Sequence, residues 1–191
     1  MGKPFKKIES GKNEVWITQP NEDKTFVKRR EIAFNVAKGK TVHNGGKIET
    51  AMQTAEAFGR GLFEEFIKDE RKEWTIKKWV DPVVKNVFNP LGTGATFTQI
   101  TDDEARFSVH TYMQNEDDAK YPYLSSLFNY GFLRGMLLSA FPDGELLMKD
   151  SMVQEAQMDE FIFKANATDS DRLERERIKN NFITENLEKK S

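Results

Sequence analysis

The chain of 191 residues contains no cysteine and only two histidines. Without cysteine it can form no disulfide, no thiolate zinc site and no cysteine nucleophile. The two imidazoles, His43 and His110, lie in unlike contexts and at no spacing typical of metal ligands. We therefore predict no metal site, and the lack of cysteine agrees with a cytoplasmic protein.

An excess of charge of one sign is also missing. The 29 Lys and Arg residues face 31 Asp and Glu residues, which gives a formal net charge of −2. A protein without a global basic field does not attract nucleic-acid phosphates over its whole surface, so such a role would need a local patch. We predict no nucleic-acid partner. The first 16 residues also lack the apolar segment of a secretory signal.

Motifs for catalysis and for phosphate binding are missing from the sequence as well. The Gly92-Thr93-Gly94 stretch lacks the later glycine and the lysine of a phosphate-binding loop. Acidic pairs such as Asp102-Asp103 sit in predicted turns, where a solvated surface is their usual role. We therefore nominate no catalytic residue and identify no cofactor.

Phenylalanine, in contrast, is abundant, with 15 residues against 4 Tyr and 3 Trp. Apolar rings are typical of a Phe-rich core, and they also line pockets for flat or greasy ligands. Residues 48–72 are predicted to form a helix because apolar side chains recur at spacings of three and four. These apolar residues are Ile48, Met52, Ala55, Phe58, Leu62 and Phe66. Gly59 and Gly61 interrupt this helix, and the close approach of another backbone would explain them.

The remaining pattern predicts a second amphipathic helix over 74–88 and four strands. The first two strands, 95–100 and 105–112, alternate and are joined by a turn, and the last two are 145–152 and 160–165.

The two ends of the chain are predicted to differ in structure from the middle. Residues 1–46 are a polar arm with a short strand over 14–18, and the type of 24–38 stays open between helix and strand. Residues 166–191 are predicted to include a charged C-terminal helix.

Residues 123–141 form the most apolar stretch of the chain. Its length would allow a membrane span, but Asn129, Arg134 and several serines argue against one. We predict a buried helix and no membrane span. Gly131 and Gly135 expose the backbone on one side of this helix and would let a neighbour approach closely.

Arg134 is the one charged residue in this apolar helix, and a buried guanidinium needs a partner. One interpretation is an internal ion pair, and the other is a ligand carboxylate or phosphate held in a dry pocket. We favour the ion pair. The candidate partners within the chain are Glu64, Glu65, Asp150 and Glu155.

Two stretches carry a resemblance to a known superfamily. Residues 57–66, AFGRGLFEEF, resemble the first helix of the 4-vinyl-reductase-like domain and of the bet-type subunits of the TRAPP tethering complex. Residues 129–137, NYGFLRGML, resemble the central buried helix of both groups. The resemblance covers residues 47–165. This chain lacks the cysteines that many 4-vinyl-reductase-like domains and the bet-type subunit carry, so it implies no metal or thiol role here.

The resemblance implies an α/β (α+β) domain in which a small antiparallel sheet of about four strands packs on two major helices. It also implies a homodimer, which an excess of apolar helix surface over one small sheet favours too. The predicted function is a non-catalytic domain that holds a hydrophobic small molecule (tetrapyrrole, aromatic or lipid) in an apolar cavity. The predicted ligand-binding residues are Phe58, Leu62, Phe66, Phe128, Phe132, Arg134 and Met136.

Two alternatives stay open. The first is a TRAPP-like tethering or scaffold subunit that acts through partner proteins. The second is an accessory or reductase component of tetrapyrrole metabolism, although the sequence has no nicotinamide or flavin fingerprint.

Overall fold

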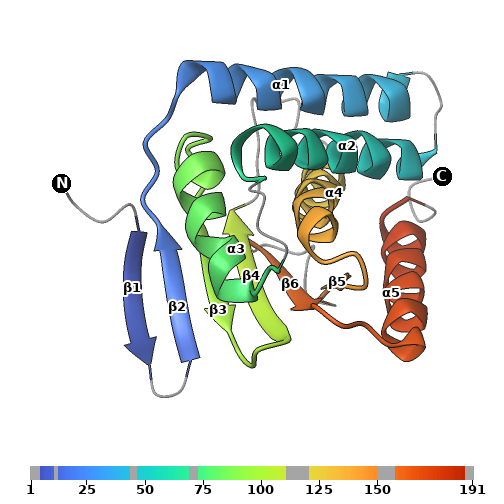
Figure 1. Ribbon diagram of the computed structural model, residues 1–191. Coiled ribbons are helices and arrows are strands. Elements are labelled where there is room, and N and C mark those ends of the chain that lie inside the picture. Colours follow the sequence, from blue (N-terminus) through green and yellow to red (C-terminus); the bar gives the residue numbers. More distant parts are fainter. Residues whose placement is uncertain are drawn as a thin grey trace.

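The computed structural model describes residues 5–10, 13–43, 47–68, 73–110, 121–149 and 158–187. They form an α+β fold in which helices lie against one antiparallel sheet (Figure 1). The helices are α1 (Lys24–Lys38), α2 (Ile48–Phe66), α3 (Ile76–Val83), α4 (Pro122–Ala140) and α5 (Asp169–Leu187), with π-helical segments η1 (Gly39–His43) and η2 (Val84–Phe88). The strands are β1 (Phe5–Ser10), β2 (Asn13–Thr18), β3 (Ala95–Gln99), β4 (Glu104–His110), β5 (Glu145–Met148) and β6 (Met158–Lys164).

The sheet has the strand order β1-β2-β3-β4-β6-β5, and each neighbouring pair is antiparallel. It therefore contains six described strands, where the sequence predicted about four. The additional strands come from the N-terminal arm, since Trp16 of β2 pairs with Phe97 of β3. The sequence missed β1 because its residues, FKKIES, have no clean apolar alternation and belong to an edge strand that pairs on one side only.

One face of the sheet carries the aromatic core. Phe97, Phe107 and Phe161 are fully buried and point toward the helices. Trp79 of α3 lies 5.9 Å from Phe107, and Tyr130 of α4 lies 6.1 Å from Phe161, measured between ring centroids. Aromatic contacts of this kind bury large apolar areas, so α3 and α4 are fixed on the same face of the sheet.

Segment 24–38, whose type the sequence left open, is the helix α1. The carboxylate of Asp23 accepts hydrogen bonds from the backbone N–H groups of Thr25 and Phe26 and so caps the first turn. Phe34 is buried, so its tertiary contacts decide in favour of the helix over the strand-like alternation.

Two other predicted helices differ from the structure in their ends. The α2 helix ends at Phe66 and not at Lys72, because the N–H groups of Ile67 and Lys68 both bond to the Phe63 carbonyl. The helix predicted over 74–88 begins at Ile76, after the N-cap residue Thr75, and consists of α3 followed directly by η2, with Pro82 inside α3. The predicted strand ends at 111–112 and 150–152 lie outside the described residues.

The α4 helix is buried in the middle of the fold, as the sequence predicted. Among the described helices, none combines the length and the apolar character that a membrane span requires.

Glycines let α2 and α4 cross at close range. A Cβ atom at Gly59 would lie 2.0 Å from the carbonyl oxygen of Phe132, and one at Gly135 would lie 2.1 Å from that of Glu56. At Gly131 it would lie 2.4 Å from a carbonyl oxygen of α2. The predicted close approach is therefore confirmed for these three glycines, because no larger residue fits between the two backbones.

Candidate functional site

Most of the predicted ligand-binding side chains lie where α2 crosses α4. The Phe58 ring centroid is 6.1 Å from that of Phe128 and 5.6 Å from that of Phe132. Leu62 and Met136 are fully buried on the same two helices. The rings pack on one another and are half-buried only at Phe58, so this part of the predicted site is an apolar core with one partly exposed edge.

The α1 helix covers this edge, which the sequence did not predict. The Phe26 ring lies 4.7 Å from that of Phe66, and the Phe34 ring meets Phe128 edge to face at 5.3 Å. Figure 1 shows α1 running alongside α2 at the top of the view. We call the six rings contributed by these helices the aromatic cluster. It consists of two groups of contacting rings, Phe26 with Phe66, and Phe34 with Phe58, Phe128 and Phe132.

The polar contacts that hold α1 over the aromatic cluster include two at its first turns. Arg29 donates a hydrogen bond to Glu65 of α2 over 2.7 Å and also lies 5.4 Å above the Phe66 ring. This hydrogen bond lowers the pKa of Glu65, although the carboxylate is exposed to solvent. Arg30 donates a further hydrogen bond to Thr93. Exposed ion pairs contribute little stability, so ring packing is the main contact of α1 with α2 and α4.

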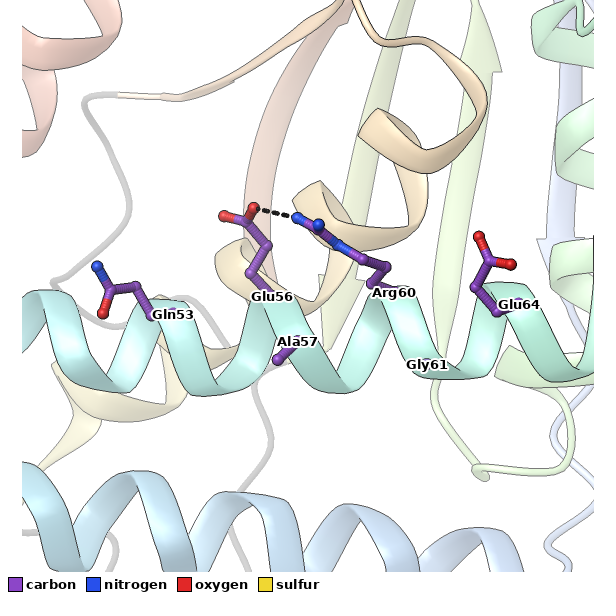
Figure 2. Close-up of a pocket in the computed structure, with 6 residues that line it drawn as sticks. All are labelled: Gln53, Glu56, Ala57, Arg60, Gly61 and Glu64. Carbon is purple, nitrogen blue, oxygen red and sulfur yellow. Dashed lines mark hydrogen bonds and ion pairs between the residues drawn. The ribbon is translucent and has the colours of Figure 1, made fainter.

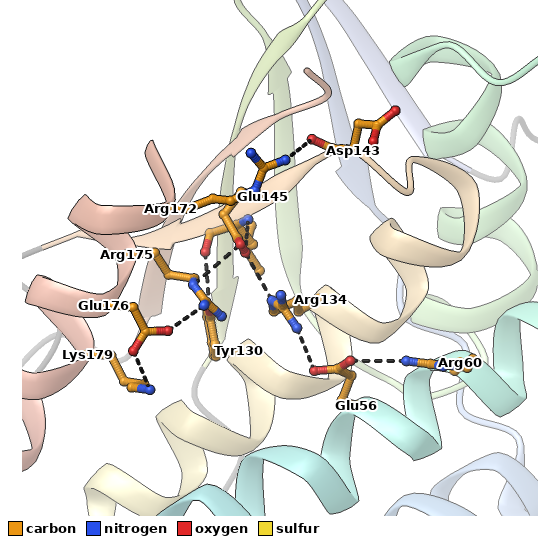
Figure 3. A network of polar contacts seen from close by, with 11 residues as sticks. Glu56, Arg60, Tyr130, Arg134, Asp143, Glu145, Arg172, Arg175, Glu176 and Lys179 are labelled. Atoms are coloured by element: carbon orange, nitrogen blue, oxygen red, sulfur yellow. Dashed lines mark hydrogen bonds and ion pairs between the residues drawn. The ribbon is translucent and has the colours of Figure 1, made fainter. Parts of the chain in front are cut away.

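Arg134, the last predicted ligand-binding residue, points away from the aromatic cluster into a network of charges (Figure 3). Its Nη1 lies 2.8 Å from Glu56 Oε2, and its Nε lies 3.0 Å from Glu145 Oε1. The exposed fraction is 17% for the side chain of Arg134 and 4% for that of Glu145. Burial alone would lower the pKa of Arg134, but the hydrogen bond to Glu145 and the neighbouring charges outweigh burial and raise it. The structure thus gives this guanidinium two carboxylates of its own chain.

The network continues from Glu145 into the C-terminal helix. Arg175 of α5 lies 3.3 Å from the second oxygen of Glu145. Nearby, the hydroxyl of Tyr130 donates a hydrogen bond to the backbone carbonyl of Leu146 over 3.1 Å. Burial raises the pKa of Tyr130 to about 12. The phenol bonds to a backbone carbonyl, and the charged groups pair with one another. The network therefore joins α2, α4, β5 and α5 and is structural in character.

The partners that the sequence nominated for Arg134 were wrong where the structure describes them. Glu64 pairs with Lys68 one turn later, and Glu65 pairs with Arg29 of α1. Glu64 lies two turns along α2 from Glu56, the residue that meets Arg134, and Glu65 faces α1. The other two candidates, Asp150 and Glu155, lie outside the described residues.

Two surface hollows lie apart from the predicted ligand-binding residues. One, of about 540 Å³, lies on the outer face of α2 and is lined by Gln53, Glu56, Ala57, Arg60, Gly61 and Glu64 (Figure 2). The other, of about 610 Å³, is lined by Glu14, Thr75, Lys77, Gln99, Ile100, Thr101 and Asp102. Both are open to solvent, so neither resembles an enclosed apolar ligand pocket.

Within the described segments, no group of three or more His, Asp or Glu side chains could hold a metal ion. Comparison with known proteins gives no family: the chain matches no protein-family model and has no significant match among curated proteins or solved structures. The resemblance to 4-vinyl-reductase-like domains and TRAPP subunits therefore stays a prediction from the sequence.

Proposed function

We propose that this protein is a non-catalytic module that binds a hydrophobic small molecule at the aromatic cluster beneath α1. The observation that carries the proposal is the arrangement of the six rings. Those of Phe26, Phe58 and Phe66 are only half-buried, whereas those of Phe34, Phe128 and Phe132 are buried. A flat or greasy molecule that inserts beneath α1 would contact rings of α1, α2 and α4.

The attachment of α1 supports entry at this place. Its first turn is anchored, since the N–H of Asp23 donates to the Pro90 carbonyl over 2.8 Å. Farther along α1, the Phe34 ring packs edge to face on Phe128 of α4. Because apolar packing is not directional, the ring contacts of α1 can adjust around an apolar ligand while its first turn stays anchored.

The charged side chain beside the half-buried rings indicates which ligands fit. Arg29 stands over the Phe66 ring and is about one-third exposed. A cation in this place would pair with a carboxylate on an otherwise apolar molecule, in competition with Glu65. The proposed ligand class is therefore an aromatic or lipid-like molecule, including one with an acidic group.

The test is a titration of the full chain with N-phenyl-1-naphthylamine, an apolar dye that fluoresces when it leaves water. We expect saturable binding of one dye per chain, and binding at least about tenfold weaker in Phe58→Gln, because a polar amide replaces a ring of the cluster. Ile32→Gln makes the same type of change at an exposed position of α1 and serves as the matched control. If the dye does not bind, or if both variants bind like the wild type, the proposal is wrong.

A second candidate function is a scaffold or tethering role through protein partners. The open outer face of α2 favours it, because this face carries an exposed glycine in the middle of a helix. The two functions are separable by mutation, since the aromatic cluster and the outer face lie on different sides of α2.

A further inference from the structure

Ser125, at the start of α4, carries a buried hydroxyl without a partner. The residue is 0% exposed, and its Oγ has no hydrogen-bond partner within the part of the chain that the structure describes. Buried hydroxyls are nearly always hydrogen-bonded, because a hydroxyl that leaves water without a new partner costs free energy. The packing of the described chain therefore does not account for a serine at this position.

The next polar residues of α4 show how the fold uses its own polar groups. Ser126 donates a hydrogen bond to the Asp159 carboxylate of β6 over 2.6 Å. Asn129 donates to the same carboxylate over 2.7 Å and to the backbone carbonyl of His110 in β4 over 3.2 Å. These bonds join α4 to the sheet, and Ser125 takes no part in them.

The position of Ser125 along α4 also places it beside the aromatic cluster. Phe128 and Phe132 follow it by three and seven residues, and residues at these spacings share one face of a helix. Phe34 of α1 meets Phe128 edge to face, with 5.3 Å between the ring centroids. Ser125 therefore lies at the border between the rings beneath α1 and the polar contacts of α4 with the sheet.

The surroundings of Ser125 favour a partner atom that accepts a hydrogen bond. Ser125 lies in the first turn of α4, and the N-terminus of a helix carries a partial positive charge. Lys38 of α1 is buried and adds a full positive charge, with its Nζ 5.9 Å from the ring centroid of Tyr121, the residue before α4. An oxygen with free lone pairs is stabilised in this field and can accept the hydroxyl hydrogen.

From these observations we propose that Ser125 is the polar end of the ligand site, where its hydroxyl donates a hydrogen bond to a carbonyl oxygen of the bound molecule. This inference rests on the proposed function and narrows its ligand class to apolar molecules that carry a carbonyl group. The apolar part of the ligand lies among the rings beneath α1. A single hydrogen bond at a buried position orients such a ligand and selects it over a pure hydrocarbon.

The test compares two ligands of nearly equal shape, 2-acetylnaphthalene and 2-isopropylnaphthalene. Each competes with N-phenyl-1-naphthylamine for the full chain, and the first carries a carbonyl oxygen where the second carries a methyl group. In Ser125→Ala we expect 2-acetylnaphthalene to bind about fivefold more weakly, because one hydrogen bond is lost. The affinity of 2-isopropylnaphthalene should stay within about twofold of its value in the wild type.

Ser126→Ala is the matched control, because it removes the neighbouring hydroxyl, which bonds to Asp159. It should lower the melting temperature and leave the ratio of the two affinities unchanged. Ser125→Ala should instead keep or raise the melting temperature of the empty protein, since its hydroxyl has no partner there and alanine favours a helix. A clear fall in the melting temperature of Ser125→Ala means that the hydroxyl is already bonded, and it overturns the inference.

The competition assay also separates this inference from the proposed function. If the dye binds but Ser125→Ala weakens both naphthalenes equally or neither of them, the hydroxyl does not contact the ligand. The inference is then wrong, and the proposed function stands. The same conclusion follows if 2-acetylnaphthalene does not displace the dye. If the dye itself does not bind to the wild type, the proposed function and this inference are both wrong.

Discussion

Replacing Arg134 with methionine tests whether the charge network between α2, α4 and α5 holds the fold together. The change leaves the aliphatic volume in place and removes the guanidinium from Glu56 and Glu145. Removal of one partner from a buried pair typically costs ~3–5 kcal/mol. Glu145 keeps Arg175 at 3.3 Å, and Glu56 keeps Arg60 at 3.1 Å, so neither carboxylate is left alone. We therefore expect the low end of that range, about 3 kcal/mol of unfolding free energy.

For a chain of this length, a loss of about 3 kcal/mol lowers the melting temperature by about 6–12 °C. Urea unfolding followed by tryptophan fluorescence and by circular dichroism measures the free energy itself. The matched control is Arg60→Met, which removes the exposed cation that also pairs with Glu56, and it should cost less than about 1 kcal/mol.

The double variant Arg134→Met with Glu145→Gln separates the ion pair from simple packing. Neutralising Glu145 removes the buried charge that Arg134→Met would leave short of a partner, so the double variant should be more stable than the sum of the two single changes by about 1–2 kcal/mol. The reasoning is refuted if Arg134→Met costs less than about 1 kcal/mol, or if its cost is the same in the Glu145→Gln background.

Three other predictions concern the helix crossing and the response to acid. Gly59→Ala should destabilise the fold by about 3 kcal/mol or more, because its Cβ would lie 2.0 Å from the Phe132 carbonyl oxygen, and urea unfolding measures the loss. Gly61→Ala should instead stabilise it by about 0.5–1 kcal/mol in the same assay, since its Cβ has free space. The hydrogen bond from Lys164 lowers the pKa of Asp171 to about 2, from an ordinary value of 3.8. A carboxyl group whose pKa is lower in the folded state stabilises the fold at pH values above its pKa in the unfolded chain. The wild type should therefore be more stable than Asp171→Asn at pH 7. The difference should disappear as the pH falls from about 4 to about 2. If the two proteins differ by the same unfolding free energy at pH 7 and at pH 2, this assignment is wrong.

The sequence predicted several elements because their local patterns are strong. The spacing of apolar residues located α2, a long apolar stretch located α4, and alternation located β3, β4 and β6. These signals depend only on the period of a helix or a strand, which a single segment carries by itself. The helix α1 is different, because its residues are mixed and gain order from rings distant in the chain. The strand over 14–18, which is β2, was predicted, but its pairing with β3 was not. The mixed residues of β1 pair only with β2.

The residues of the candidate site were likewise predicted only in part. The sequence nominated rings on α2 and α4, and the structure brings Phe58, Phe128 and Phe132 together. It did not nominate Phe26 or Phe34, because nothing local shows that α1 lies over α2. Packing between elements creates that edge of the aromatic cluster, and such packing depends on the whole fold.

Arg134 shows most clearly what the sequence determines and what the tertiary structure determines. The sequence by itself determined that this residue needs a partner, because a guanidinium on an apolar helix cannot lose its charge or remain unpaired in the core. Only the tertiary structure decided that the partners are Glu56, which is 78 residues away, and Glu145, which follows in the next strand. The glycines of the crossing bring the α2 and α4 backbones into contact and thereby set Glu56 beside Arg134. An ion pair of this kind forms between surfaces that meet only after the helices have packed, so no local pattern encodes it.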